Sequence, residues 1–431
     1  MRPLLLCLLA TLTVLAAWTA VVGLGTLEGW WRRPLAPRGD AVAFARAADR
    51  MLEAESRGNI AFALIEDGQI FHERFASVGA PVGRDTLFQV ASLSKWITAL
   101  GVMTLVDSGR VDLDAPVETY LKRWRLPPSG FDNRQVTVRR LLSHTAGLTD
   151  GLGYGGFAPG QPVQPLVESL TKAVDASPGK DGSVKVGVQP GSEWRYSGGG
   201  YALLQLMIED VTGEPFAAYM KRAVLAPMGM DSSTFEPPGA QAPRLAESFD
   251  KAGKSSPLRH FTASSAAGLH TSVADLAKLI QAHRPGPTGA AIGRGVLSPG
   301  ALTEMRRPHG RQYGAEIWGL GVMLYAPNNA GSFIIGHDGD NEPAINTAAR
   351  LDPDSGDGIV VLETGTPLLA TRLAGEWVFW RTGHVDTLTV LMEARRTLTV
   401  LVVGWAAILA LGLIAGWRLW RRRLTTPAKP A

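Results

Sequence analysis

Residues 87–109 read LFQVASLSKWITALGVMTLVDSG and place Ser92 and Lys95 three positions apart, where an apolar helix is expected to begin. Residues i and i+3 share one face of a helix, so the Lys95 ammonium should lie beside the Ser92 hydroxyl. At a helix N-terminus, free backbone NH groups and the helix dipole favour negative charge, which an attacked carbonyl oxygen acquires. The stretch therefore has the layout of an activated serine nucleophile.

The spacing of this serine and lysine is not specific by itself, because it occurs four times in the chain: Ser92/Lys95, Ser169/Lys172, Ser177/Lys180 and Ser248/Lys251. Only Ser92 opens a long helix with apolar residues on nearly every side, as expected of a helix buried in a core. A buried lysine is costly unless it has a partner or a task. Context rather than spacing makes Ser92 the candidate nucleophile.

A candidate partner for the nucleophile is Tyr196, in the stretch PGSEWRYSGGGYALLQLMIEDVTG at residues 190–213. It lies in a Gly-rich turn before an apolar helix, where a side chain can face a cleft. A phenol has a pKa near 10, and an adjacent ammonium would favour the phenolate and lower that value. The alternative, which the local sequence alone favours, is a tyrosine that anchors a loop through its hydroxyl.

A third candidate element is His337-Asp338-Gly339, which follows the strand-like run SFIIG. The backbone NH of Asp340, just past the glycine, would supply an oxyanion donor, and His337 would donate a hydrogen bond near Tyr196. The alternative is a polar turn between two strands, because Asp and Gly are common turn residues.

The order of the predicted elements indicates an α/β (α+β) fold. An amphipathic helix at 41–56 precedes two strand-like runs around Asp67-Gly68, a strong hairpin signal. Helical patterns and loops fill the middle of the chain. Further strands are expected at 319–325, 332–336, 344–351 and 358–363, with a closing helix at 367–380. We therefore predict one antiparallel sheet built from both ends of the domain, a mostly helical insertion, and an active site in the groove between them.

Both ends of the chain contain long runs without a charged residue, at 3–27 and 397–417. Each is long enough to span a bilayer, because about 20 helical residues cover about 30 Å. The first run, 1–27, is either a signal peptide or an uncleaved anchor. The remaining residues, 40–385, are enough for one large domain or two small ones.

Basic residues predict the orientation of these spans. The tail at 418–431 has five of them and no acidic residue, against two just before the second span. The tail residues are Arg418, Arg421, Arg422, Arg423 and Lys429. The tail is therefore expected in the cytoplasm and the domain on the extracytoplasmic side.

The net charge of +4 comes from that tail, since removing its five basic residues leaves 4 − 5 = −1. No basic face remains to indicate nucleic-acid binding. Cys7 is the only cysteine, so the chain has no internal disulfide. The eight histidines are scattered without the spacing of metal ligands, so no metal site is predicted.

Seven motifs occur in the order found in one known family: FQVASLSKWITA, LLSHTAGL, PGSEWRYSGGGYALL, LAPMGMDSSTF, AAGLHTSVADLAKL, WGLGV and GHDG. In these motifs the chain resembles the serine beta-lactamase and penicillin-binding-protein-like hydrolases, particularly the class C, esterase and D-aminopeptidase branch. The resemblance covers roughly residues 45–380 and implies a beta-lactamase/transpeptidase-like fold.

The resemblance also implies roles for individual residues. Ser92 would be the acylated nucleophile, with Lys95 and Tyr196 as its acid/base partners. His337 stands where relatives carry lysine or histidine, and the backbone NH groups of Ser92 and Asp340 would form the oxyanion hole. No metal or organic cofactor is implied, and the partner would be a small-molecule ester, amide or peptide substrate.

Two positions depart from the family pattern. Gly198 stands where the second motif usually has an asparagine that binds substrate and orients the lysine. Asp338 stands where the third motif often has threonine or serine, and an ionised aspartate there would repel a substrate carboxylate. We therefore expect an esterase-like or peptidase-like hydrolase for a neutral or cationic acyl substrate, rather than a beta-lactamase.

The loss of the asparagine also favours an alternative, a noncatalytic binding or regulatory membrane module that retains the fold. The intact Ser92, Lys95 and Tyr196 oppose this alternative.

Overall fold

The computed structural model describes residues 2–150, 153–238, 244–286 and 289–425. Its main element is an eight-stranded antiparallel sheet with the order β2-β1-β10-β9-β8-β7-β6-β5. The strands are β1 (Ile60–Glu66), β2 (Gln69–Ala76), β5 (Gly310–Gln312), β6 (Ala315–Trp318), β7 (Met323–Pro327), β8 (Phe333–Asn341), β9 (Ile345–Leu351) and β10 (Gly358–Thr364). Strands from both ends of the domain lie side by side, which confirms the predicted sheet.

The turn between β1 and β2 explains why the chain reverses there. Asp67 and Gly68 both have positive φ, 49° and 70°, as the two central residues of a type I′ hairpin turn require. Ile60 of β1 then pairs with Ala76 of β2 on one side and with Glu363 of β10 on the other. This register joins the beginning and the end of the domain in one sheet.

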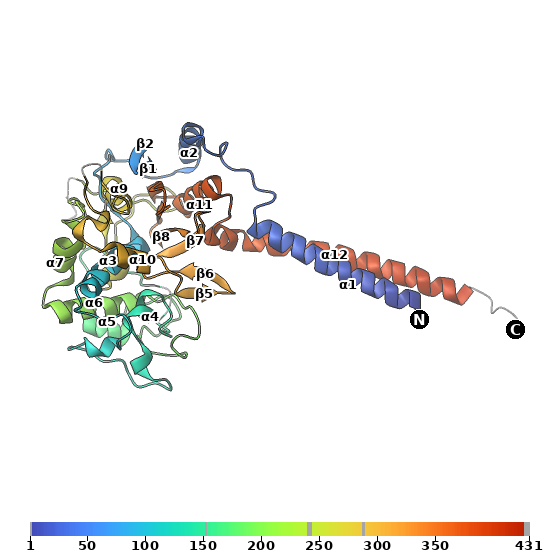
Figure 1. Cartoon of the computed structure of the whole chain (residues 1–431), viewed down its shortest axis with the longest axis horizontal. Coiled ribbons are helices and arrows are strands. Elements are labelled where there is room, and N and C mark those ends of the chain that lie inside the picture. The colour runs from blue at the N-terminus through green and yellow to red at the C-terminus, as the bar shows by residue number, and fades with distance from the viewer. Residues whose placement is uncertain (1, 151–152, 239–243, 287–288, 426–431) are drawn as a thin grey trace.

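Helices cover both faces of the sheet (Figure 1), because successive side chains of its central strands face two separate apolar cores. In β1, Phe62 and Leu64 face the core that α2 (Ala41–Glu55) and α11 (Leu369–Thr382) cover. The intervening β1 residues face the larger core, which contains α3 (Ser94–Asp107). The active-site elements therefore lie on the α3 face.

The predicted helical insertion lies between β2 and β5. Besides α3 it contains α4 (Val138–Leu142), α5 (Leu166–Lys172), α6 (Gly198–Thr212), α7 (Phe216–Met220), α8 (Ser264–Ala267), α9 (Val273–Gln281), α10 (Pro299–Met305) and the strand pair β3 (Phe88–Gln89) and β4 (His270–Thr271). Helix α6 begins at the Gly-rich turn after Tyr196, where Ser197 caps it through a hydrogen bond from the backbone NH of Gly200.

Strand β8 is longer than the sequence predicts, because β9 pairs with it as far as Asn341. His337, Asp338 and Gly339 therefore lie within a strand, and their interpretation as a polar turn is wrong. In the described part of the chain, β7 pairs with β8 only as far as Gly336. The β8 residues after Gly336 therefore contact the turn that carries Ser92 instead of pairing with β7.

Two long apolar helices, α1 (Arg2–Leu27) and α12 (Thr387–Thr425), run side by side away from the sheet (Figure 1). Both are long and apolar enough to cross a membrane, by length and composition. Residues 426–431, including Lys429 of the predicted basic tail, lie outside the described residues.

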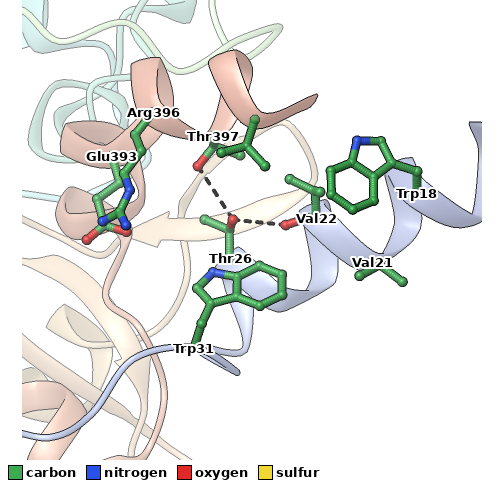
Figure 2. Close-up of a pocket in the computed structure, with 9 residues that line it drawn as sticks. Trp18, Val21, Val22, Thr26, Trp31, Glu393, Arg396 and Thr397 are labelled. Carbon is green, nitrogen blue, oxygen red and sulfur yellow. Dashed lines mark hydrogen bonds between the residues drawn. The ribbon is translucent and has the colours of Figure 1, made fainter. Parts of the chain in front are cut away.

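The two long helices contact each other at the end nearest the sheet domain. The hydroxyls of Thr26 and Thr397 lie 3.4 Å apart (Figure 2), and Arg32 forms ion pairs with Glu376 of α11 and Glu393 of α12. The contact encloses a largely apolar cleft of about 300 Å³. Its lining residues are Trp18, Val21, Val22, Thr26, Trp31, Glu393, Arg396, Thr397 and Val400.

Candidate active site

Ser92 lies in a 3₁₀ turn, Ala91–Leu93, that leads directly into α3. Ala91 has a left-handed φ of 46°, a conformation that persists only where the surroundings enforce it. Strand β8 enforces it by close approach, since a Cβ on Gly339 would lie 2.0 Å from the carbonyl oxygen of Val90. Only glycine fits at position 339, and the third motif supports the nucleophile turn from behind.

Lys95 is buried at the centre of the site, with 2% of its surface exposed. Its Nζ donates hydrogen bonds to Ser92 Oγ at 3.1 Å and to the carbonyl oxygen of Ala266 at 2.9 Å. It also lies 4.8 Å from the centre of the Tyr196 ring. Burial lowers the pKa of Lys95 to about 7, although the more distant Asp150 opposes this shift. The amine is therefore able to lose its proton near neutral pH and to act as a base.

Tyr196 lies between the nucleophile and a cluster of aromatic rings. Its ring centre is 4.4 Å from that of His144 and 5.7 Å from that of Trp318. Burial raises the pKa of the Tyr196 hydroxyl, and a hydrogen bond with Ser92 only partly opposes this shift. The expectation that Lys95 lowers this pKa is therefore wrong, because the desolvated lysine readily gives up its charge. Tyr196 is a protonated phenol, suited to passing a proton on.

His337 lies on the same side of the sheet as the nucleophile, with its ring 5.4 Å from that of Trp318. Its Nδ1 is 2.6 Å from the carbonyl oxygen of Asp338 and must donate to it. Burial and the charge of Lys95 lower the pKa of His337 to about 3, so the ring is neutral. Its buried Nε2, which has no partner among the described residues, is then an acceptor. The sequence predicts that His337 donates a hydrogen bond near Tyr196. This prediction is wrong, because the nitrogen that remains available, Nε2, is a hydrogen-bond acceptor.

The Asp338 side chain lies on the opposite face of the sheet from the nucleophile. It accepts hydrogen bonds from the Tyr325 hydroxyl at 2.6 Å and from the Arg350 guanidinium at 2.8 Å. Arg350 is completely buried and also pairs with Asp386 at 3.3 Å. Asp338 therefore does not line the substrate site, and the argument that it repels a substrate carboxylate is wrong. Alternation along β8 turns it away, and Arg350 neutralises its charge.

Asp340 follows Gly339 on β8 and pairs in register with Asn346 of β9. Although the residue as a whole is exposed, partial burial of the carboxylate, together with the neighbouring Glu342 and Asp338, raises its pKa. Strand β8 contacts the turn that carries Ser92. The backbone NH groups of Ser92 and Asp340 thus belong to two segments that meet at the site.

The second motif is fixed by a carboxylate that the sequence analysis does not identify, Asp150. One Asp150 oxygen accepts a hydrogen bond from the Ser197 hydroxyl at 2.5 Å, and the other accepts one from the backbone NH of Gly199 at 2.7 Å. Burial raises the pKa of Asp150. Between these two contacts lies Gly198, where an added Cβ would lie 3.0 Å from the ring of Tyr154.

Two further supporting residues are His144, which the family resemblance marks as a structural residue of a loop beside the cleft, and Trp318, to which the sequence assigns no role. His144 Nδ1 accepts a hydrogen bond from the backbone NH of Ser197 at 3.2 Å, and Trp318 packs on both His144 and His337. Both residues lie in quoted motifs, LLSHTAGL and WGLGV, which is the only signal that marks them. In the described part of the chain, no three His, Cys, Asp or Glu side chains gather as a metal-binding group.

The site combines a serine that is hydrogen-bonded to a buried lysine with a tyrosine beside them and an antiparallel sheet behind. This combination is that of a serine hydrolase. The chain belongs to the beta-lactamase family, because the Beta-lactamase family model matches residues 44–377. It is 30% identical over 327 residues to esterase EstB of Burkholderia gladioli, covering 66% of this chain and 80% of that protein. It is 35% identical over 153 residues to penicillin-binding protein 4* of Bacillus subtilis, covering 36% and 31% respectively.

The fold is also found in solved structures. The octameric penicillin-binding protein homologue from Pyrococcus abyssi matches with a TM-score of 0.62 and 26% identity, over 78% of this chain and 76% of that chain. A D-stereospecific amidohydrolase from Streptomyces matches with a TM-score of 0.58 and 21% identity, over 82% and 98% respectively. At 21% identity, the likeness to the amidohydrolase shows the fold alone.

Proposed function

We propose that this protein is a membrane-anchored serine hydrolase that cleaves a neutral ester or amide through an acyl-enzyme on Ser92. The observation that carries the proposal is the 3.1 Å contact between Lys95 Nζ and Ser92 Oγ, made by a lysine whose pKa burial lowers to about 7. A lysine that is neutral near pH 7 is a competent base for a serine hydroxyl.

In the proposed mechanism, neutral Lys95 takes the Ser92 proton as Ser92 Oγ attacks the substrate carbonyl carbon. The backbone NH groups of Ser92 and Asp340 stabilise the resulting oxyanion. When the bond to the leaving group breaks, the protonated Lys95 returns the proton to that group through the Tyr196 hydroxyl. Water then attacks the acyl-enzyme by the same route, which releases the acid and restores Ser92.

The proposed preference for a neutral substrate is based on His337 and not on Asp338. A substrate carboxylate would meet a neutral imidazole whose buried Nε2 is an acceptor, and an acceptor cannot bind a carboxylate. Because Asp338 is paired with Arg350 on the other face, its charge does not favour a cationic substrate. We therefore propose a neutral acyl group and no beta-lactamase activity.

The test is hydrolysis of p-nitrophenyl esters and of nitrocefin by the purified full-length protein, with Ser92→Ala as the control. We expect ester hydrolysis that the substitution abolishes, and negligible nitrocefin turnover. Clear nitrocefin turnover with negligible ester hydrolysis would reverse the proposed substrate class. A folded wild-type protein that a fluorophosphonate probe does not label would instead support the noncatalytic module.

We also propose that the domain at 40–385 lies on the extracytoplasmic side of the cell membrane and that the tail at 418–431 lies in the cytoplasm. The length and apolar character of α1 and α12 support this, as does the excess of basic residues after 417. The hydrogen bonds from Trp18 Nε1 to the carbonyl oxygen of Leu401 and from Trp405 Nε1 to the Thr19 hydroxyl, at 3.4 Å and 2.9 Å, favour an uncleaved first helix. Mass spectrometry of the isolated protein should therefore find residues 2–27 retained, and a mature N-terminus near residue 24 would contradict it.

A further inference from the structure

We propose that Tyr154 takes the place of the missing side chain at Gly198 and gives the substrate site an aromatic wall that selects acyl groups without an amide. This inference rests on the proposed hydrolase function and deepens it, because it assigns a specificity-determining residue and a class of acyl group. The asparagine expected at position 198 would bind substrate through its amide, and a phenol ring has no such group.

The ring of Tyr154 lies in tight contact with the position that a side chain at residue 198 would take. A Cβ there would lie 3.0 Å from Tyr154 Cε2 and 3.3 Å from Cδ2. An asparagine at position 198 would therefore require the ring of Tyr154 to shift. We therefore interpret the two residues together: glycine at position 198 allows the ring of Tyr154 to lie where it does.

The backbone on both sides of Gly198 is fixed, so it cannot move away from Tyr154. Ser197 is held through its hydroxyl by Asp150 and through its backbone NH by His144, at 2.5 Å and 3.2 Å. The backbone NH of Gly199 is held by the same Asp150 at 2.7 Å. The segment that carries the ring is held as well, because Tyr154 forms a β-bridge with Ala176 and the backbone NH of Gly155 donates to the carbonyl oxygen of Asp175 at 2.7 Å.

The other task of the missing asparagine, orienting the lysine, is performed by other groups. Lys95 Nζ donates to the carbonyl oxygen of Ala266 at 2.9 Å and lies over the ring of Tyr196. Loss of the asparagine therefore leaves the nucleophile and its base in place while it changes what the substrate contacts. This separation predicts an altered choice of substrate rather than a loss of catalysis.

The ring of Tyr154, rather than its hydroxyl, carries this role. The hydroxyl oxygen is buried and has no hydrogen-bond partner among the described residues. Burial raises the pKa of this hydroxyl, and the carboxylates of Asp150 and Asp175 raise it further, so it stays neutral. Tyr154→Phe should therefore keep the wild-type preference among substrates, which distinguishes the ring from its polar atom.

The experiment compares Gly198→Asn, Tyr154→Ala, the double variant and Tyr154→Phe with wild type, all as full-length protein. Each is assayed for kcat/KM on p-nitrophenyl butyrate and on the p-nitrophenyl ester of N-acetylglycine, whose acyl group has an amide. The fraction labelled by a fluorophosphonate probe corrects every rate for competent protein. The thermal midpoint of unfolding is measured for the same proteins.

Gly198→Asn alone should lower the thermal midpoint and reduce kcat/KM about tenfold or more on both esters, because the new side chain clashes with the ring. Adding Tyr154→Ala should restore the midpoint and shift the ratio of the two kcat/KM values about tenfold toward the N-acetylglycine ester. Tyr154→Phe should keep the wild-type ratio. A double variant with the wild-type ratio, or a Gly198→Asn variant with unchanged midpoint and rates, would overturn the inference.

Failure of the proposed function is recognisable separately, because wild type would then carry no probe and hydrolyse neither ester. In that case the thermal midpoints decide the inference. Additive effects of the two substitutions would refute it, whereas rescue of Gly198→Asn by Tyr154→Ala would show that Tyr154 fills the place of the side chain at 198.

Discussion

Two buried cations on opposite faces of the sheet are treated in opposite ways. Lys95 has 2% of its surface exposed and forms no ion pair within the part of the chain that the structure describes, and burial lowers its pKa to about 7. Arg350 is completely buried between Asp338 and Asp386, whose charges raise its pKa. Burial imposes a cost on both groups, but only Arg350 has carboxylates that offset it.

The difference shows how one strand serves both chemistry and architecture. His337 and Gly339 face the nucleophile, whereas Asp338 between them faces Arg350. A buried cation without a carboxylate becomes a base near neutral pH, and one with two carboxylates remains a charged structural centre. The same contrast explains why Asp338 has no part in substrate selection.

The largest expected effect is at the nucleophile on the lysine side of this comparison. Ser92→Ala removes the oxygen that attacks the substrate and should reduce kcat/KM on p-nitrophenyl esters by at least about 10³-fold. Mass spectrometry should also find no fluorophosphonate adduct on this variant. The unfolding midpoint should stay near that of wild type, and residual labelling of a folded variant would place the nucleophile elsewhere.

Tyr196→Phe tests whether the phenol passes the proton. It keeps the ring that packs against His144 and removes only the hydroxyl, so we expect kcat to fall by about 10²- to 10⁴-fold. The rate at which a fluorophosphonate probe labels Ser92 above about pH 7, where Lys95 is neutral, should fall in parallel. If the variant turned over substrate at the wild-type rate, Tyr196 would be only an anchor for its loop.

Arg350→Met tests the architectural side. It leaves Asp338 and Asp386 buried without a counter-charge, so the free energy of unfolding should fall by about 3–5 kcal/mol. The matched control is Arg134→Met, which breaks an ion pair to Asp132 at an arginine that is 82% exposed, and should leave the free energy of unfolding nearly unchanged because solvent screens the pair. Denaturant unfolding measures both. Equal losses would mean that the buried network has no special role.

Lys95→Met tests whether the lysine is held at a cost to stability. Folding lowers the pKa of Lys95 from 10.5 to about 7, so between these values the unfolded chain binds more protons and wild-type stability rises with pH. The destabilisation is complete below about pH 7 and disappears as pH approaches 10.5. Lys95→Met should therefore gain more stability over wild type at about pH 7 than at about pH 9.5. A gain that grows with pH would contradict the lowered pKa.

Much of the fold could be predicted from local signals. Asp67 and Gly68 fix the hairpin by their positive φ values, and Ser92 precedes the helix that its apolar neighbours indicate. The orientation of Asp338 could not be predicted, because it depends on β8 continuing to Asn341 and on an arginine in the next strand.

The burial of individual side chains also could not be predicted from the sequence. The pKa of Tyr196 rises rather than falls because desolvation outweighs its neighbours. The roles of Asp150 and Tyr154 depend on contacts across 47 and about 44 positions of the chain, respectively, which no local pattern indicates. Residue types predicted the chemistry, whereas side-chain direction and burial decided which residues take part.

The central claim, that burial turns Lys95 into the base for Ser92, is tested most directly by the pH dependence of Ser92 acylation. The rate of fluorophosphonate adduct formation on full-length protein should rise with pH, with an apparent pKa of about 7, and level off above it. Lys95→Arg should abolish this rise, because arginine stays protonated. A rate that keeps rising with a midpoint near 10.5, the ordinary value for lysine, would contradict the account.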